Sequence, residues 1–152
     1  FAWHSTLHTL SDHVGVGGGY GGGANWQGPR DWTPSDYAPG ARCIDTTKPF
    51  DVAVSFPIDA AGSLVAMEIQ LTQPGQGCPL SLRLGNYQGL HELSRALEEG
   101  MTPIISYWSS GDMQWMDGKG TDGQGPCATD DPGQCAESVK FYNFSIGTIG
   151  SP

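Results

Sequence analysis

Residues 49–57 read PFDVAVSFP and residues 64–73 read LVAMEIQLTQ, and in both stretches apolar side chains alternate with polar or small ones. Such alternation predicts β-strands with one buried face. Residues 60–63 form a short Gly-containing turn between them, so the two stretches predict an antiparallel hairpin. The alternating apolar side chains are Phe50, Val52, Val54 and Phe56 in the first stretch and Val65, Met67, Ile69 and Leu71 in the second.

The remaining elements are short. Leucines recur at helical spacing between Gly89 and Gly100, and a glycine after the last periodic residue is typical of a helix end. Residues 104–108 and 139–149 are apolar or alternating and predict strands, and 113–116 could form another. Short strands, one small helix and many turns favour an all-β sandwich.

Residues 14–23 read VGVGGGYGGG, which is typical of a turn-rich loop. Gly17, Gly19 and Gly22 satisfy a G-x-G-x-x-G pattern, but no clean strand precedes them and no helical pattern follows, so nucleotide binding is not expected. We expect residues 1–40 to be rich in loops and the strands of the sandwich to lie in 41–152, with regular structure beginning after Cys43. With 152 residues, the chain has room for one domain.

The net charge of −9 would repel nucleic acid and anionic membrane surfaces, so neither is an expected partner. No apolar run approaches the roughly 20 residues of a membrane-spanning helix, so no membrane insertion is expected. The sequence opens with Phe1, which suggests a processed chain or a piece of a longer protein.

The four cysteines match no zinc pattern, and two disulfides are the expected state. Three connectivities are open, and we favour Cys127–Cys135, which closes a short loop, and Cys43–Cys78 by elimination. Disulfides indicate an oxidising, extracellular setting. Asn143 begins an N-glycosylation motif, Asn-Phe-Ser, which points to the same setting.

Aromatic side chains are the most conspicuous candidates for ligand contact, because their faces stack on the apolar faces of sugar rings. Trp26 and Trp32 lie in polar, Gly- and Pro-rich sequence, where a buried role is less expected, whereas Trp108 and Trp115 could equally fill the core. Asp112 and Asp117 flank Trp115 and are the best local acids for contacting a ligand. No strand offers two acids on one face, as a retaining glycosidase would need. The histidines at 4, 8 and 13 do not suggest a metal site, and no cofactor is expected.

Several motifs, in order along the chain, resemble the family 7 glycoside hydrolases, which include cellulases. They are residues 31–34 (DWTP), 44–52 (IDTTKPFDV), 99–108 (EGMTPIISYW), 113–117 (MQWMD) and 139–150 (VKFYNFSIGTIG). The resemblance covers most of the chain from about Asp31 onward. It implies the C-terminal portion of a concanavalin-like antiparallel β-sandwich (jelly roll), with one short helix and long Gly-rich loops.

The resemblance also implies a site. The family's catalytic E-x-D-x-x-E strand would lie just before Phe1, so this chain contains no catalytic residue and His4 would be an active-site neighbour. Trp108 and Trp115 would be platforms of a β-glucan-binding cleft, with Arg30 near it. The loop between the two tryptophans is shorter than in the family, and Gln124 stands where an arginine is expected.

The sequence therefore predicts the C-terminal part of a secreted, family 7-like β-1,4-glucan hydrolase. It would cleave with retention only when joined to the missing upstream carboxylates. Half a sandwich would expose a hydrophobic face, so the missing N-terminal half or another protein chain is an expected partner. The alternative is a non-catalytic, extracellular glycan-binding or structural protein that reuses the fold.

Overall fold

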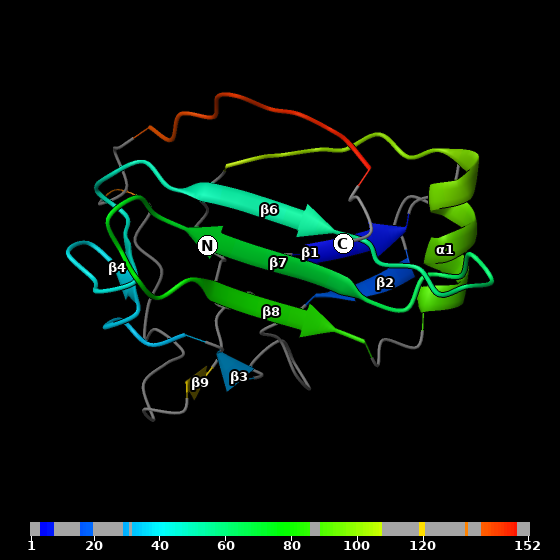
Figure 1. Ribbon diagram of the computed structural model, residues 1–152, viewed down its shortest axis with the longest axis horizontal. Helices are drawn as coiled ribbons and strands as arrows, with labels where there is room; N and C mark the ends of the chain where they lie inside the picture. Colours follow the sequence, from blue (N-terminus) through cyan, green and yellow to red (C-terminus); the bar gives the residue numbers. More distant parts are fainter. Residues whose placement is uncertain are drawn as a thin grey trace.

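The computed structural model describes residues 4–7, 16–19, 29–30, 32–85, 89–107, 119–120, 133 and 138–148. Its centre is an antiparallel sheet of three strands, β6 (Asp51–Ser55), β7 (Met67–Thr72) and β8 (Leu80–Leu84). These strands run lengthwise across the molecule, with α1 at one end and β4 at the other (Figure 1). Most elements are strands, as predicted, and the sandwich stays a prediction.

The predicted hairpin is confirmed by the pairing of β6 with β7. Val52 lies opposite Leu71 and Val54 opposite Ile69, so these four side chains share one face of the sheet. The third strand, β8, continues this face with Leu80 opposite Leu71 and Leu82 opposite Ile69. The apolar alternation of β6 and β7 is therefore in register with that of β8.

The core lies on this apolar face, mainly over β7 and β8. Ile69 and Leu71 are 2% and 0% exposed, and they pack with Cys43, Ile44 and Leu80. On β6, by contrast, Val52 and Val54 are 49% and 44% exposed. The prediction that the apolar face of 49–57 is buried is therefore wrong for β6, because the layer that covers β7 and β8 does not extend over it among the described residues.

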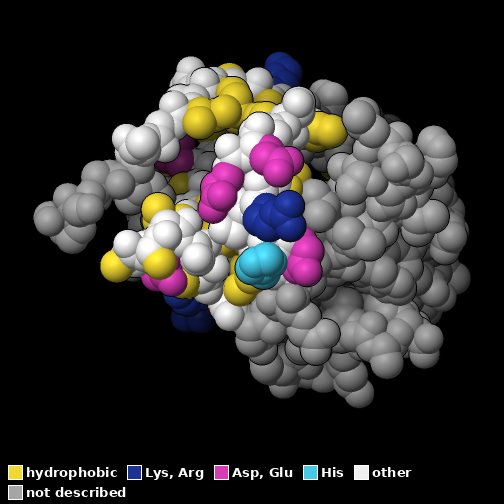
Figure 2. Space-filling view, turned by 90° about the vertical axis from the view of Figure 1, so that its right-hand side faces the viewer, with side chains coloured by type: hydrophobic (Ala, Val, Ile, Leu, Met, Phe, Trp, Pro, Cys, Tyr) yellow, Lys and Arg dark blue, Asp and Glu magenta, His cyan; other side chains and the backbone are white. Residues whose placement is uncertain are grey.

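The predicted helix is confirmed as α1 (Leu90–Glu99), and Gly100 follows it with a φ of 100°. Leu93 packs against Leu64 and Met67 at one end of the sheet. Ser94 Oγ also accepts a hydrogen bond from the backbone N–H of Leu64 at 3.0 Å. The opposite side of α1 faces solvent, and charged side chains gather on the face of the molecule seen from this end (Figure 2). The exposed polar residues of α1 are His91, Glu92, Arg95, Glu98 and Glu99.

The other strands form three small pairs. β1 (His4–Leu7) pairs antiparallel with β2 (Val16–Gly19). β3 (Pro29–Arg30) pairs in parallel with β9 (Lys119–Gly120). β4 (Tyr37–Ala38) also pairs in parallel, with β5 (Ile44–Asp45). The expectation that regular structure begins only after Cys43 is wrong. The pairing of β1 with β2 is made by backbone hydrogen-bonding groups, and glycines carry these groups as other residues do. The alternation of side chains therefore gives no sign of this pair in the sequence.

Two predicted strands are not strands in the structure. Residues 101–107 and 138–148 are exposed throughout, and no hydrogen bond of the described part involves them. A strand needs a neighbouring strand to bond its backbone, and alternation in a single segment cannot supply that partner. Residues 113–116, the other predicted strand, lie outside the described residues. No helix in the described ranges has the length and apolarity to cross a membrane.

Candidate functional site

The face of the central sheet opposite the core is polar. Ser55, Glu68 and Arg83 lie side by side across β6, β7 and β8. The Ser55 hydroxyl donates to Glu68 Oε2 at 3.2 Å, and the Arg83 guanidinium pairs with Glu68 Oε1. Glu68 therefore faces a hydroxyl and a cation, with no second acid directly opposite. This trio offers polar contacts to a ligand but lacks the paired carboxylates of glycoside hydrolysis.

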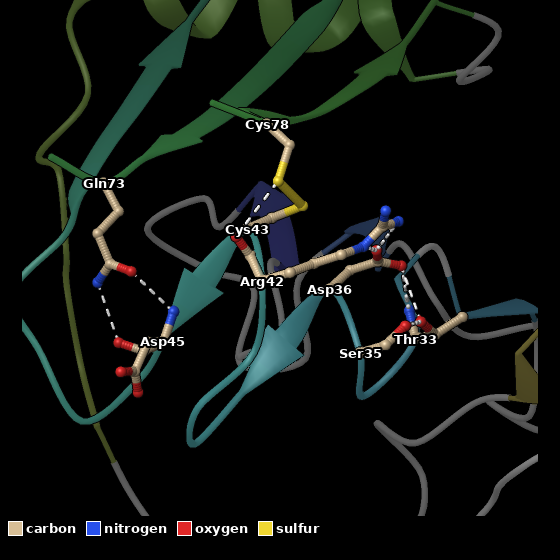
Figure 3. Close-up of a disulfide and its surroundings, with 8 residues drawn as sticks. All are labelled: Thr33, Ser35, Asp36, Arg42, Cys43, Asp45, Gln73 and Cys78. Carbon is tan, nitrogen blue, oxygen red and sulfur yellow. Dashed lines mark hydrogen bonds and ion pairs between the residues drawn. A yellow bond between two sulfur atoms is a disulfide. The ribbon is translucent and has the colours of Figure 1, made fainter. Parts of the chain in front are cut away.

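A second polar cluster surrounds Asp45 beside the central disulfide (Figure 3). Asp45 Oδ1 accepts hydrogen bonds from Gly40 N at 2.8 Å and from Thr47 Oγ1 at 2.7 Å, and its Oδ2 pairs with Lys48 Nζ at 2.8 Å. These donors, Lys48 foremost, hold the pKa of Asp45 well below its usual range. Because every partner comes from residues 40–48, the Asp45 carboxylate fixes the local chain and is not free for a ligand.

The loop before this cluster is closed by Asp36. Its Oδ2 accepts from Thr33 Oγ1 at 2.8 Å, and its Oδ1 pairs with Arg42 Nη2 at 2.6 Å (Figure 3). The Arg42 guanidinium and then the Thr33 hydroxyl lower the pKa of Asp36. Arg42 is largely exposed, so this pair stabilises the loop only weakly.

The disulfide Cys43–Cys78 is present, and this half of the predicted connectivity is confirmed. It joins the start of β5 to the segment before β8 across 35 residues of sequence. Cys43 belongs to the core cluster, so the disulfide ties the β4–β5 region to the central sheet. Cys127 and Cys135, the other predicted pair, lie outside the described residues.

An aromatic row packs against the same core. The ring centroids of Trp32 and Tyr37 are 6.1 Å apart, and Tyr37 meets Phe50 edge-on at 6.0 Å. Burial raises the pKa of Tyr37 to about 12. All three rings contact the core cluster, so Trp32 is a packing residue and not a free platform for a sugar ring.

The structure places two of the predicted site residues on small strands. His4 begins β1, opposite Gly19 of β2. Arg30 of β3 lies opposite Gly120 of β9. Trp26, Trp108, Asp112 and Trp115 themselves lie outside the described residues.

Asn143, the predicted glycosylation site, lies in the exposed segment 138–148. Within the described ranges, no group of three or more His, Cys, Asp or Glu side chains is placed to hold a metal ion.

Sequence reasoning missed two features. Leu80, Leu82 and Leu84 alternate with Ser81 and Arg83, and this pattern was sufficient to predict β8. Gln73, a buried amide that binds the backbone around Asp45, carries no such signal, because glutamine is usually a surface residue.

The chain is similar to a curated protein, "Endoglucanase 1" of Pyricularia oryzae, with 28% identity over 144 aligned residues. The match covers 71% of this chain but only 33% of the endoglucanase, so the chain spans about a third of the length of this relative. No protein-family model matches the chain, and no solved structure matches it. The similarity supports a cellulase-like relationship.

Proposed function

We propose that the chain is the C-terminal part of a family 7-like glycoside hydrolase that binds a β-1,4-glucan. The observation that carries the proposal is the similarity to Endoglucanase 1 over 71% of the chain. The ordered motifs between residues 31 and 150 point to the same family.

The family's catalytic E-x-D-x-x-E motif does not occur in the sequence of this chain. A retaining mechanism uses two carboxylates about 5–5.5 Å apart. In the described part, Asp36, Asp45 and Glu68 are each held in an ion pair with a basic side chain. The proposed hydrolysis with retention therefore depends on upstream carboxylates, and the chain by itself binds glucan without cleaving it.

The uncovered apolar face of the sheet supports a need for further polypeptide. Val52, Val54, Phe56 and Ile58 follow one another at every second position and are 41–63% exposed. Val52 and Val54 lie on the face of the sheet on which Ile69 and Leu71 are buried. Since a sheet normally buries its apolar face under a second layer, we expect the upstream half of the domain, or another chain, to cover it.

The setting is proposed to be extracellular. A disulfide persists in oxidising compartments, and the similarity to an endoglucanase is consistent with the same setting.

The test is sedimentation of the chain with insoluble cellulose, together with an assay for newly released reducing ends. We expect binding without cleavage. Trp108→Ala should abolish binding without changing the melting temperature, if Trp108 is a platform. Trp32→Ala is the matched control, because it removes a ring packed on the core and should lower the melting temperature. Absence of any binding to β-glucans would overturn the proposal, and cleavage by the isolated chain would overturn its catalytic part.

A further inference from the structure

The exposed apolar side chains of the described residues are not scattered over the molecule. The large ones all fall in three stretches, 52–58 in and just after β6, 101–107 and 139–146. The last two stretches pass along the side of β6 that faces away from β7 (Figure 1), and hydrophobic side chains gather on the same upper side when the molecule is turned (Figure 2). We call the surface made by residues 52–58, 101–107 and 139–146 the apolar flank.

The apolar flank is large for a surface left in water. Ile104 and Ile146 are 83% and 77% exposed. A monomeric protein rarely exposes a contiguous apolar patch of more than a few hundred Å². A standard protein interface uses roughly 20–30 residues on each side, and the three stretches together are of this length. The flank is therefore large enough to form one side of a stable protein interface.

The charge of the flank differs from that of the whole chain. The flank contains no acidic residue, and Lys140 is its single charged residue. The whole chain has 16 Asp and Glu against 7 Lys and Arg, and its net charge is −9. Two copies therefore repel each other overall, and the repulsion is weakest when their acid-free surfaces face each other. Electrostatics favours the flank as the surface through which two copies meet.

A contact between two flanks closes on itself. When one patch meets its own copy, a two-fold axis relates the two chains and no free patch remains for a third. On β6, Val52 and Val54 lie on the apolar face of the sheet but are exposed. In a dimer, each copy would supply the second layer that this part of the other copy's sheet lacks.

We propose that the chain forms a two-fold symmetric dimer through the apolar flank. The inference goes beyond the proposed function, because it depends neither on glucan binding nor on an upstream half of the domain. It names a second copy of this chain as the polypeptide that covers β6. Because association depends on concentration, the flank is exposed in the monomer that dominates in dilute solution.

The test is sedimentation velocity of the chain over a range of protein and salt concentrations. We expect the mass to rise from that of one chain, 16.1 kDa, to twice that value and no further. The dissociation constant should fall as sodium chloride is raised, because salt screens the repulsion between two chains of charge −9. A chain that stays monomeric at every concentration, or that grows past the dimer, would overturn the proposal. A dissociation constant that rises with salt would also overturn it, because such a rise indicates a contact made by ion pairs.

Two variants locate the contact. Val54→Lys places a charge on the flank and should raise the dissociation constant at least about tenfold, because the two-fold axis buries the new lysine twice. Gln70→Lys is the matched control, since it adds the same charge at an exposed position on the opposite face of the same sheet. It should leave the dissociation constant nearly unchanged. Melting temperatures measured in dilute solution check that both variants are folded. Equal dissociation constants for the two folded variants would show that the copies do not meet through the flank.

Discussion

The side-chain amide of Gln73 binds the backbone of Asp45 as a neighbouring strand would (Figure 3). Gln73 Oε1 accepts a hydrogen bond from Asp45 N at 2.8 Å, and Gln73 Nε2 donates to Asp45 O at 3.0 Å. The same Nε2 also donates to Pro49 O at 3.0 Å. One side chain therefore satisfies two buried backbone groups of β5 and also bonds the backbone at the entry to β6.

Replacing Gln73 should be costly. In Gln73→Ala the backbone N–H and C=O of Asp45 stay buried without these partners, which should lower the free energy of unfolding by about 1–3 kcal/mol. Gln70→Ala, on the adjoining strand β7, is the matched control, because Gln70 is exposed and its replacement should cost little. The measurement is urea denaturation followed by fluorescence. Equal midpoints for the two variants would contradict the anchoring role of Gln73.

Asp45 should make the stability of the fold sensitive to acid. Its pKa is lowered below the usual value of 3.8, chiefly by Lys48, so the folded state favours the carboxylate. A lowered folded-state pKa contributes stability above the unfolded-state pKa, and this contribution is lost as pH falls below about 4. We expect Asp45→Asn to be less stable than the wild type at pH 7 and to lose less stability between pH 5 and pH 2.

The measurement for Asp45 is thermal unfolding across that pH range. Asp51→Asn, on the exposed part of β6, serves as the control. A wild-type and an Asp45→Asn profile that run parallel through the acid range would exclude Asp45 as the source of the pH dependence.

The disulfide should stabilise the fold by restricting the unfolded chain. Cys43 and Cys78 are 35 residues apart, and closing a loop of this size is worth about 2–4 kcal/mol. The double variant Cys43→Ala/Cys78→Ala should lose this amount in denaturant unfolding. Its stability should also respond less than that of the wild type to a reducing agent. A double variant as stable as the oxidised wild type would contradict the role of this disulfide.

The two sides of the β6–β7 pair should differ sharply in their tolerance of truncation. Leu71→Ala creates a cavity in the core and should cost about 2–5 kcal/mol. Val54→Ala, at a position that is 44% exposed, should cost about 1 kcal/mol or less in the isolated chain. Calorimetric melting of both variants tests this difference. A cost at Val54 as large as at Leu71 would mean that β6 is covered in solution.

Much of the central region could be predicted from local patterns. The β6–β7 hairpin and α1 are visible in the sequence because alternation and helical spacing are properties of a few consecutive residues. The small strand pairs could not be predicted. The pairing of β3 with β9, for example, joins segments 90 residues apart and uses backbone bonds alone. The candidate site was predictable only as a list of residues, because Trp26, Arg30 and Trp108 are not close together in the sequence and local patterns do not place distant side chains relative to one another.

The sequence by itself determined where the hairpin and the helix form, because each depends on side chains close along the chain. The tertiary structure alone decided which apolar faces are buried. Val54 and Ile69 have the same alternating pattern, yet Val54 is 44% exposed and Ile69 is 2% exposed, because the layer that the described residues form packs on Ile69 and not on Val54. The tertiary structure also decided the pairing of Cys43 with Cys78, which occurs in one of the three possible connectivities, because folding brings the Cα atoms of these two residues to 5.0 Å. The alternation of apolar side chains shows which face of a strand can be buried. Whether that face is buried depends on a second layer, which comes from residues distant in the sequence.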